Sequence, residues 1–304
     1  MNGSAALYRG TFAAPGTVDS IVPIGQPQPH LNYERTMLSI DSIDRDSSVY
    51  TSANEYSIRL RTPFKNIVEV RLLSIEVPAS FYIFSAAAGN TTLLIKETGP
   101  GWGSFRSIIL PDGNYTLLEL CDTLTGLFQT VTGRATYLVS LNLNTLRITI
   151  SNSDAVPFRI DTKTGALPQG VFWGLGYCLG FNKGVYASGT GTMTAPRIAN
   201  INPYNYMILD LGDLNMVQEG EIMKGYFAKV PINVQNFNYI YLTPECCDYN
   251  VAHFEPPLGK LEKINIKWRF HDGRLIDFNG FEHSFMLEIV TGEARLKHPQ
   301  INRI

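Results

Sequence analysis

The sequence predicts a mainly β protein, an antiparallel β-sandwich of jelly-roll type with one inserted amphipathic helix and an extended N-terminal arm. Three observations lead to this class: many segments in which apolar and polar residues alternate, turn residues (26 Gly and 17 Pro) spread between them, and an aromatic content of 11%. Aromatic and β-branched side chains fit a pleated surface, and regularly spaced turn signals separate short strands. With 304 residues, the chain is long enough to enclose a substantial core.

Charged residues make up only 17% of the chain, and 25 Lys and Arg nearly balance 27 Asp and Glu. Soluble domains usually carry roughly 25% charged residues, so we expect other molecules to cover part of this surface. We expect no nucleic-acid partner, because a protein dedicated to nucleic acid carries a basic stripe and no run of like charges occurs here.

The chain shows no signal peptide and no continuous apolar run long enough for a transmembrane segment. Its four cysteines lack the C-x-x-C spacing, and Cys246 adjoins Cys247, which is a poor framework for disulfides. We therefore expect a reducing, intracellular setting.

Three parts are predicted along the chain: an extended arm over 1–33, a β-sandwich body over 34–292 and a mildly basic tail over 293–304. The arm is rich in Pro and Gly and has no hydrophobic period, so it has little to bury by itself. The body forms either one jelly roll with insertions or two packed subdomains, and the sequence leaves both open.

The first strands of the body lie over 56–61 and 66–77. In the second, apolar residues hold even positions up to Leu72 and odd positions from Leu73 onward. A strand cannot change the face of its apolar side chains without a fault, so we expect a β-bulge or a crossing between sheets near these two leucines.

A helix is predicted over about 116–132. Thr116 and Glu119 match a capping box, apolar residues follow at spacings of three and four, and Gly133 is a suitable terminator.

Further strands are expected at 206–211 and 238–243, together with two hairpins. The first hairpin runs over 137–150 with its turn at Asn144 and Thr145, and the apolar faces of its strands include Leu143 and Leu146. The second joins an alternating strand over 264–270 to another over 285–289.

No catalytic motif, cofactor-binding motif or metal motif appears, so we expect no catalytic residue, no cofactor and no metal. His253 and His283 would hold a metal only if the fold brought them together, and structural roles are the better interpretation. Asp41, Asp44 and Asp46 form the densest acidic cluster, which lacks the Gly and Glu of a calcium loop and is typical of a capped turn.

Four residues are candidates for contact with a partner: Lys263, Lys267, Arg269 and Trp102. The three cations share the polar face of one strand, where they either protect an edge or meet an acidic neighbour. Trp102 lies in a glycine-rich segment and is either an exposed aromatic at a contact or a core residue.

Three segments, 56–82, 112–120 and 261–289, together resemble the minor capsid and penton (vertex) proteins of large icosahedral nucleocytoplasmic double-stranded DNA viruses. They contain the runs Val68-Glu69-Val70-Arg71-Leu72-Leu73, Asp112-Gly113-Asn114-Tyr115-Thr116 and Asp277-Phe278-Asn279-Gly280. The resemblance covers about two thirds of the chain, and that family's major capsid protein, with its two jelly rolls, is clearly longer.

The resemblance implies a structural role in the virion, without enzymatic activity, and assembly in the host cytoplasm. The protein would cement major capsomers beside other minor capsid proteins, or it would occupy the five-fold vertex as a homopentameric penton. Two alternatives stay open: a carbohydrate- or receptor-binding module that uses Trp102 or Trp173, and a β-sandwich glycoside hydrolase. The enzyme would need two facing carboxylates, and the sequence offers no such pair.

Overall fold

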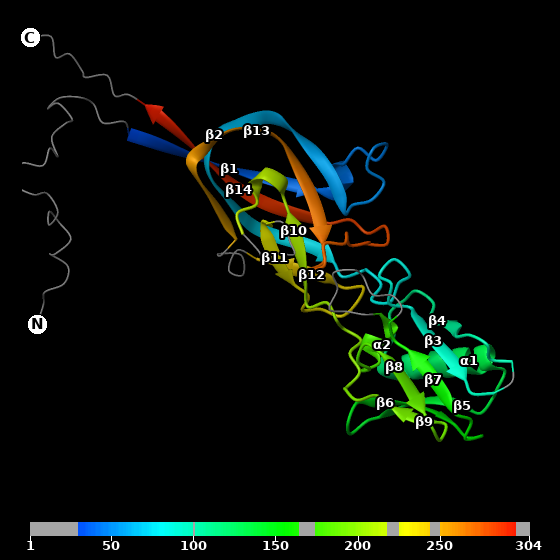
Figure 1. Ribbon diagram of the computed structural model, residues 1–304. Coiled ribbons are helices and arrows are strands. Elements are labelled where there is room, and N and C mark those ends of the chain that lie inside the picture. The colour runs from blue at the N-terminus through cyan, green and yellow to red at the C-terminus, as the bar shows by residue number, and fades with distance from the viewer. Residues whose placement is uncertain (1–29, 100, 164–173, 218–224, 244–249, 296–304) are drawn as a thin grey trace, which may run out of the picture.

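The computed structural model describes residues 30–99, 101–163, 174–217, 225–243 and 250–295. Most of the predicted arm, the last nine residues of the predicted tail, and Trp173 lie outside these ranges. The described chain is mainly β with curled antiparallel sheets, as expected of a jelly-roll-like sandwich (Figure 1).

Seven strands form the largest sheet, in the order β1-β14-β2-β13-β10-β11, with β12 also paired to β2. The strands are β1 (His30–Asp41), β2 (Glu55–Pro78), β10 (Tyr206–Asp210), β11 (Ala228–Pro231), β12 (Tyr239–Leu242), β13 (Val251–Arg269) and β14 (Ser284–Arg295). Both β2 and β13 bend strongly, so this sheet folds over its own core (Figure 1). Two short 3-10 helices, η1 (Ser42–Asp44) and η2 (Gly212–Leu214), follow β1 and β10.

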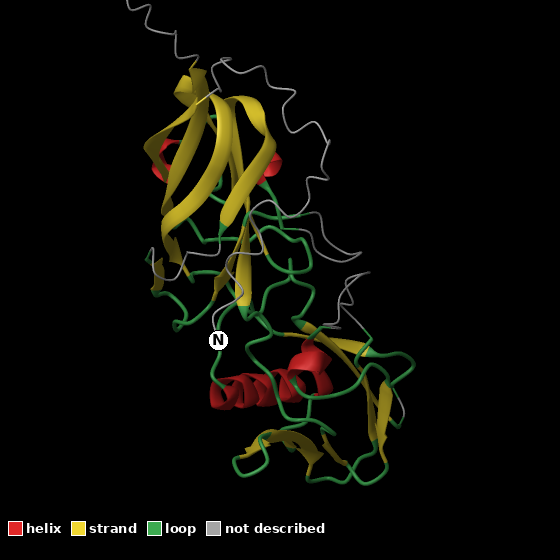
Figure 2. Cartoon of the chain, turned by 90° about the vertical axis from the view of Figure 1, so that its left-hand side faces the viewer, coloured by secondary structure: helices red, strands yellow, loops and turns green. Residues whose placement is uncertain are grey.

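Two smaller sheets and the helices lie between β2 and β10 in the sequence and form a second group in space (Figure 2). The four-stranded sheet has the order β4 (Arg106–Ile109), β3 (Thr92–Glu97), β7 (Phe158–Asp161), β8 (Val185–Ser188). The three-stranded sheet has the order β5 (Tyr137–Asn142), β6 (Arg147–Asn152), β9 (Thr192–Thr194). The helices are α1 (Leu117–Thr132) and α2 (Leu175–Cys178). None of the helices in the described ranges is long and apolar enough to span a bilayer.

The predicted fault in β2 is confirmed as a β-bulge. Met286 of β14 pairs with Ser74, whereas the next residue, Leu287, pairs with Leu72, so Leu73 has no partner in this ladder. Because of the extra residue, the nearest buried position before the bulge is even, at Leu72, and the nearest one after it is odd, at Ile75. The apolar residues on both sides of the bulge therefore reach the core.

The predicted helix is confirmed as α1, including both of its ends. Thr116 and Glu119 form the reciprocal capping box, and Gly133 ends the helix with a φ of 74°. A left-handed residue at this position favours glycine, since a side chain would clash there.

We expect Thr116→Ala to lower the free energy of unfolding by about 1 kcal/mol, because it leaves the Glu119 amide without its cap. Chemical denaturation measures the change. Thr130→Ala on the exposed side of the same helix is the control, expected to change stability by less than about 0.5 kcal/mol. Equal losses in the two variants would contradict a capping role.

The first predicted hairpin is confirmed as β5 and β6, although its turn is wider than predicted. Leu143 and Leu146 lie in the turn with exposed fractions of 70% and 42%, so they do not extend the apolar faces of the strands. The Asn142 side chain accepts from the amides of Asn144 and Thr145, and this capping fixes the wider turn.

The second predicted hairpin is wrong, because β13 and β14 do not pair with each other. Each pairs with β2, on its two opposite edges. The connection over 270–283 carries the chain past β2. The alternating pattern of two strands does not predict that a third strand, distant in the sequence, pairs between them.

Candidate assembly surface

Strand β1 forms a free edge of the large sheet, since β14 is its only partner among the described strands. It begins at His30, inside the segment predicted as arm. On one face of β1, Tyr33 is 60% exposed and Met37 is 69% exposed. A long edge strand with unpaired backbone groups and exposed apolar side chains is a template for pairing with another chain.

The start of β1 and the end of β14 project from the sandwich as a two-stranded ribbon (Figure 1). The last pair between β14 and β2 joins Thr291 to Ile67, whereas β14 continues alongside β1 as far as Arg295. We call residues 30–34 and 291–295 the β1–β14 ribbon. Its residues 32–34 are exposed on both faces, and an isolated strand pair is only marginally stable in water.

A belt of ion pairs crosses the outer face of the sheet behind the ribbon. Glu288 of β14 lies between Arg35 of β1, at 3.3 Å, and Arg71 of β2, at 3.9 Å. Glu69 continues the belt, 2.9 Å from Arg71 and 3.4 Å from His253 on β13. The three ion pairs and the Glu69–His253 contact of this belt span four strands, up to the point where the ribbon leaves the sheet.

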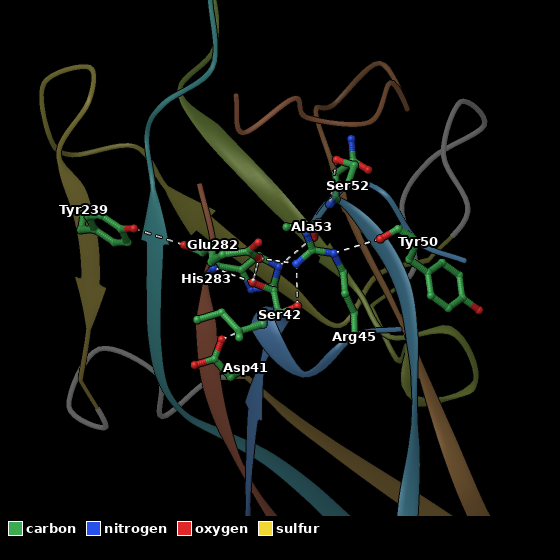
Figure 3. Close-up of polar contacts among 11 residues, drawn as sticks. Asp41, Ser42, Arg45, Tyr50, Ser52, Ala53, Tyr239, Glu282 and His283 are labelled. Carbon is green, nitrogen blue, oxygen red and sulfur yellow. Dashed lines mark hydrogen bonds and ion pairs between the residues drawn. The ribbon is translucent and has the colours of Figure 1, made fainter. Parts of the chain in front are cut away.

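A polar clamp fixes the loop between β1 and β2 against the start of β14 (Figure 3). Arg45 donates to the Glu282 carboxylate at 2.5 Å and to the Ser42 carbonyl at 2.7 Å. Ser42 in turn donates its hydroxyl to Glu282 and accepts from the His283 amide. Burial alone would raise the pKa of Glu282, but the hydrogen bonds from Arg45 and Ser42 outweigh it and hold that pKa below its usual value.

His283 lies beneath this clamp and is only 2% exposed. Its Nε2 atom lies 2.9 Å from the Ala53 carbonyl, and the rings of Tyr56 and Trp268 pack against the imidazole. Burial lowers the pKa of His283 to about 4, because the charged form loses its water. The neutral imidazole therefore donates to Ala53 and ties the loop to the core.

The three cations predicted as contact residues are on one face of β13, but two of them are neutralised within the chain. Lys267 lies 2.6 Å from Glu55, and Arg269 is ion-paired with Asp210. Lys263 is exposed and pairs in register with Arg59, which is also a cation.

Trp102 is half-buried and packs against the edge of the core. The guanidinium of Arg106 lies over its ring, 4.1 Å from the ring centroid. This stacking covers one face of the indole with a cation of the same chain.

A cleft of about 780 Å³ lies beside β13 and contains two carboxylates, Glu55 and Asp210. Both are ion-paired, with Lys267 and with Arg269. Asp210 also accepts from the Gly212 amide and from the Asn215 side chain. The two groups therefore hold β13 and η2 in place and are not a free pair facing a ligand.

The two histidines weighed as metal ligands do not share a site, since His283 is buried under the clamp and His253 lies exposed beside Glu69. No group of three or more potential ligands gathers to hold a metal within the described ranges. In the acidic cluster, Asp41 accepts from the Ile43 amide and Asp46 accepts from Ser48, as predicted for a capped turn.

Sequence reasoning missed the β1 edge because β1 starts inside a segment without regular alternation. Asn32, Glu34 and Arg35 are polar and lie on both faces of the strand, and the apolar period becomes visible only from Leu38 to Ile40. Tyr33 and Met37, spaced by four, were the available signal, but without the partner strand their exposure could not be inferred.

The fold and this surface define a mainly antiparallel β protein with a projecting strand pair at a free sheet edge. A family model described as a family of unknown function (DUF5901) matches residues 31–177. No curated protein matches the chain. Among solved structures, the chain is similar to the crystal structure of the selenomethionine-labelled mavirus penton protein. That similarity covers 86% of this chain and 100% of the other, with a TM-score of 0.47 and 7% sequence identity.

Proposed function

We propose that this protein is a structural component of a viral capsid. The observation that carries the proposal is the free edge of β1, which has exposed Tyr33 and Met37 and projects at its start as the β1–β14 ribbon. In an isolated molecule such an edge exposes unpaired backbone groups and apolar side chains to water. In a permanent assembly, a neighbour pairs with the edge and covers its apolar residues. The resemblance of the three sequence segments to minor capsid and penton proteins supports the same role.

We propose the finer role of a minor capsid protein that cements major capsomers or of a penton at the five-fold vertex. The predicted arm, residues 1–33, runs into β1 in the sequence, so we propose that neighbouring subunits bind the arm and the free edge of β1 together. The role requires no catalytic residue, and the partners would be capsomers, other minor capsid proteins or further copies of this chain. The two positions differ in copy number, since a penton occupies each vertex as a ring of five.

Two variants test the proposal. One lacks residues 1–29, and the other carries the double change Tyr33→Lys with Met37→Lys. We expect each to reduce incorporation into particles at least tenfold, since each removes contact area or places charge on the free edge. Mass spectrometry of purified particles gives the copy number. A double lysine change at exposed Leu138 and Val185, away from the edge, serves as the control.

The deletion variant and the double lysine variant should both melt as cooperatively as the unaltered chain. This result would separate loss of assembly from loss of folding. If this chain is absent from particles that carry the unaltered gene, the capsid role is wrong. If the edge variants are incorporated normally, the edge is not the assembly surface.

A further inference from the structure

The bend of the large sheet carries cations in an arrangement that a free molecule does not favour. Lys65 of β2 lies directly opposite Lys260 of β13, and Arg59 lies directly opposite Lys263. All four are exposed, and so is Arg61. Like charges directly opposite each other in an antiparallel pair are destabilising, so an anionic partner would stabilise this cluster.

We call these five cations, Arg59, Arg61, Lys65, Lys260 and Lys263, the basic ridge. One carboxylate beside the ridge forms an ion pair with it, from Glu262 to Lys260. The ridge therefore keeps a strong excess of positive charge. The same bend gives the ridge an apolar border. It consists of two exposed prolines, Pro63 and Pro257, and two half-buried side chains, Phe64 and Leu258.

A second surface of the same chain has the complementary chemistry. The loop over 41–49 presents Asp44 and Asp46 together with Ile43, which is 68% exposed, and Val49, which is 65% exposed. The clamp through Arg45 and Glu282 holds this loop in one conformation, so little ordering entropy would be lost when it docks (Figure 3).

The loop and the ridge lie at different points along β2. Ser284 of β14 pairs with Asp41 of β1 on one side and with Glu76 of β2 on the other, so Asp41 and Glu76 occupy the same row of the sheet. Lys65 lies eleven residues from Glu76 along β2, a length of roughly 36 Å measured along the strand. In the described part of the chain, no hydrogen bond or ion pair joins the carboxylates of the loop to a cation of the ridge.

We infer that the 41–49 loop of one copy docks on the basic ridge of a second copy. Charge complementarity selects the orientation, and the apolar side chains of the loop meet the apolar border of the ridge. Because loop and ridge are different surfaces, the contact is head-to-tail, and repeated contacts of this kind close into a ring or extend as an open chain. This inference rests on the proposed function and names one of its neighbours as the same chain.

Sedimentation of the full chain over a range of protein and salt concentrations tests the inference. We expect association that weakens as salt rises. The loop reversal Asp44→Lys with Asp46→Lys and the ridge reversal Lys65→Glu with Lys260→Glu should each weaken it at least tenfold. A mixture of the two variants should restore it in part, since the loop of the ridge variant and the ridge of the loop variant are both unaltered. Combining both reversals in one chain should restore association only in part, because Arg59, Arg61 and Lys263 keep their positive charge.

The matched control reverses exposed charges elsewhere, through Asp122→Lys and Lys183→Glu, and should leave association unchanged. Thermal melting confirms that each variant folds. An unaltered chain that stays monomeric up to about 100 µM, or reversals without effect, would overturn the inference. Failure of the capsid role is measured separately, as absence of the chain from particles.

Discussion

Lowering the pH from 7 to 5 is expected to reduce the free energy of unfolding by about 2 kcal/mol through His283 alone. The folded protein lowers the pKa of His283 from its ordinary value of 6.5 to about 4. Between these values the unfolded chain binds a proton that the folded chain does not. Stability is therefore fully present above pH 6.5 and falls as the pH drops towards 4, by about 1.4 kcal/mol per pH unit.

The variant His283→Phe should lose this pH dependence. Phenylalanine keeps a ring among Tyr56, Trp268 and Phe278, but it leaves the Ala53 carbonyl without a donor, so the variant should be about 1 kcal/mol less stable at pH 7. Urea unfolding at pH 7, 6 and 5 measures the difference. The window ends at pH 5 because Glu282, whose pKa is lowered in the fold, stops stabilising the protein only at lower pH.

Exposed His253 provides the control, and His253→Gln should keep the slope of the unaltered chain. Asp41, Glu282 and Arg45 are the charged groups near His283, and none of them changes in this comparison. If the free energy of unfolding fell equally with pH in the unaltered chain and in His283→Phe, this histidine would not be the source of the acid sensitivity.

Removing the guanidinium of the clamp is expected to cost about 3 kcal/mol. Arg45→Met keeps an apolar stem but removes the guanidinium hydrogen bonds to Glu282 and to the carbonyls of Ser42 and Tyr50. The Arg45 side chain is 12% exposed and that of Glu282 is 30% exposed, and leaving one charge of such a partly buried pair alone is destabilising. Chemical denaturation measures the loss, and amide hydrogen exchange should show faster opening over 42–54.

Arg35→Met is the matched control, because the Arg35 side chain is 65% exposed and is also ion-paired with a glutamate. A pair with such an exposed partner contributes little, so we expect a loss below about 1 kcal/mol. Equal losses at Arg45 and Arg35 would mean that the clamp does not hold the loop.

Features determined by neighbouring residues could be predicted from the sequence. The capping box at Thr116 and Glu119 involves residues three apart, and the bulge at Leu73 follows from a change of parity within one strand. Both depend on local geometry, which a single segment contains completely.

Features that depend on distant partners could not be predicted. The pairing of β13 and β14 with β2, rather than with each other, is decided by a strand about 200 residues away. The same holds for charges. Lys267 and Arg269 looked available beside Lys263, yet Glu55 and Asp210 neutralise them, whereas the like-charged pair of Lys263 and Arg59 exists only in the folded register.

A reconstruction of the intact particle tests the central claim most directly. We predict copies of this chain in the shell, with the free edge of β1 paired to a strand of a neighbouring subunit and with Tyr33 and Met37 covered. Particles that lack the chain, or that contain it with the β1–β14 ribbon facing solvent, would contradict the account.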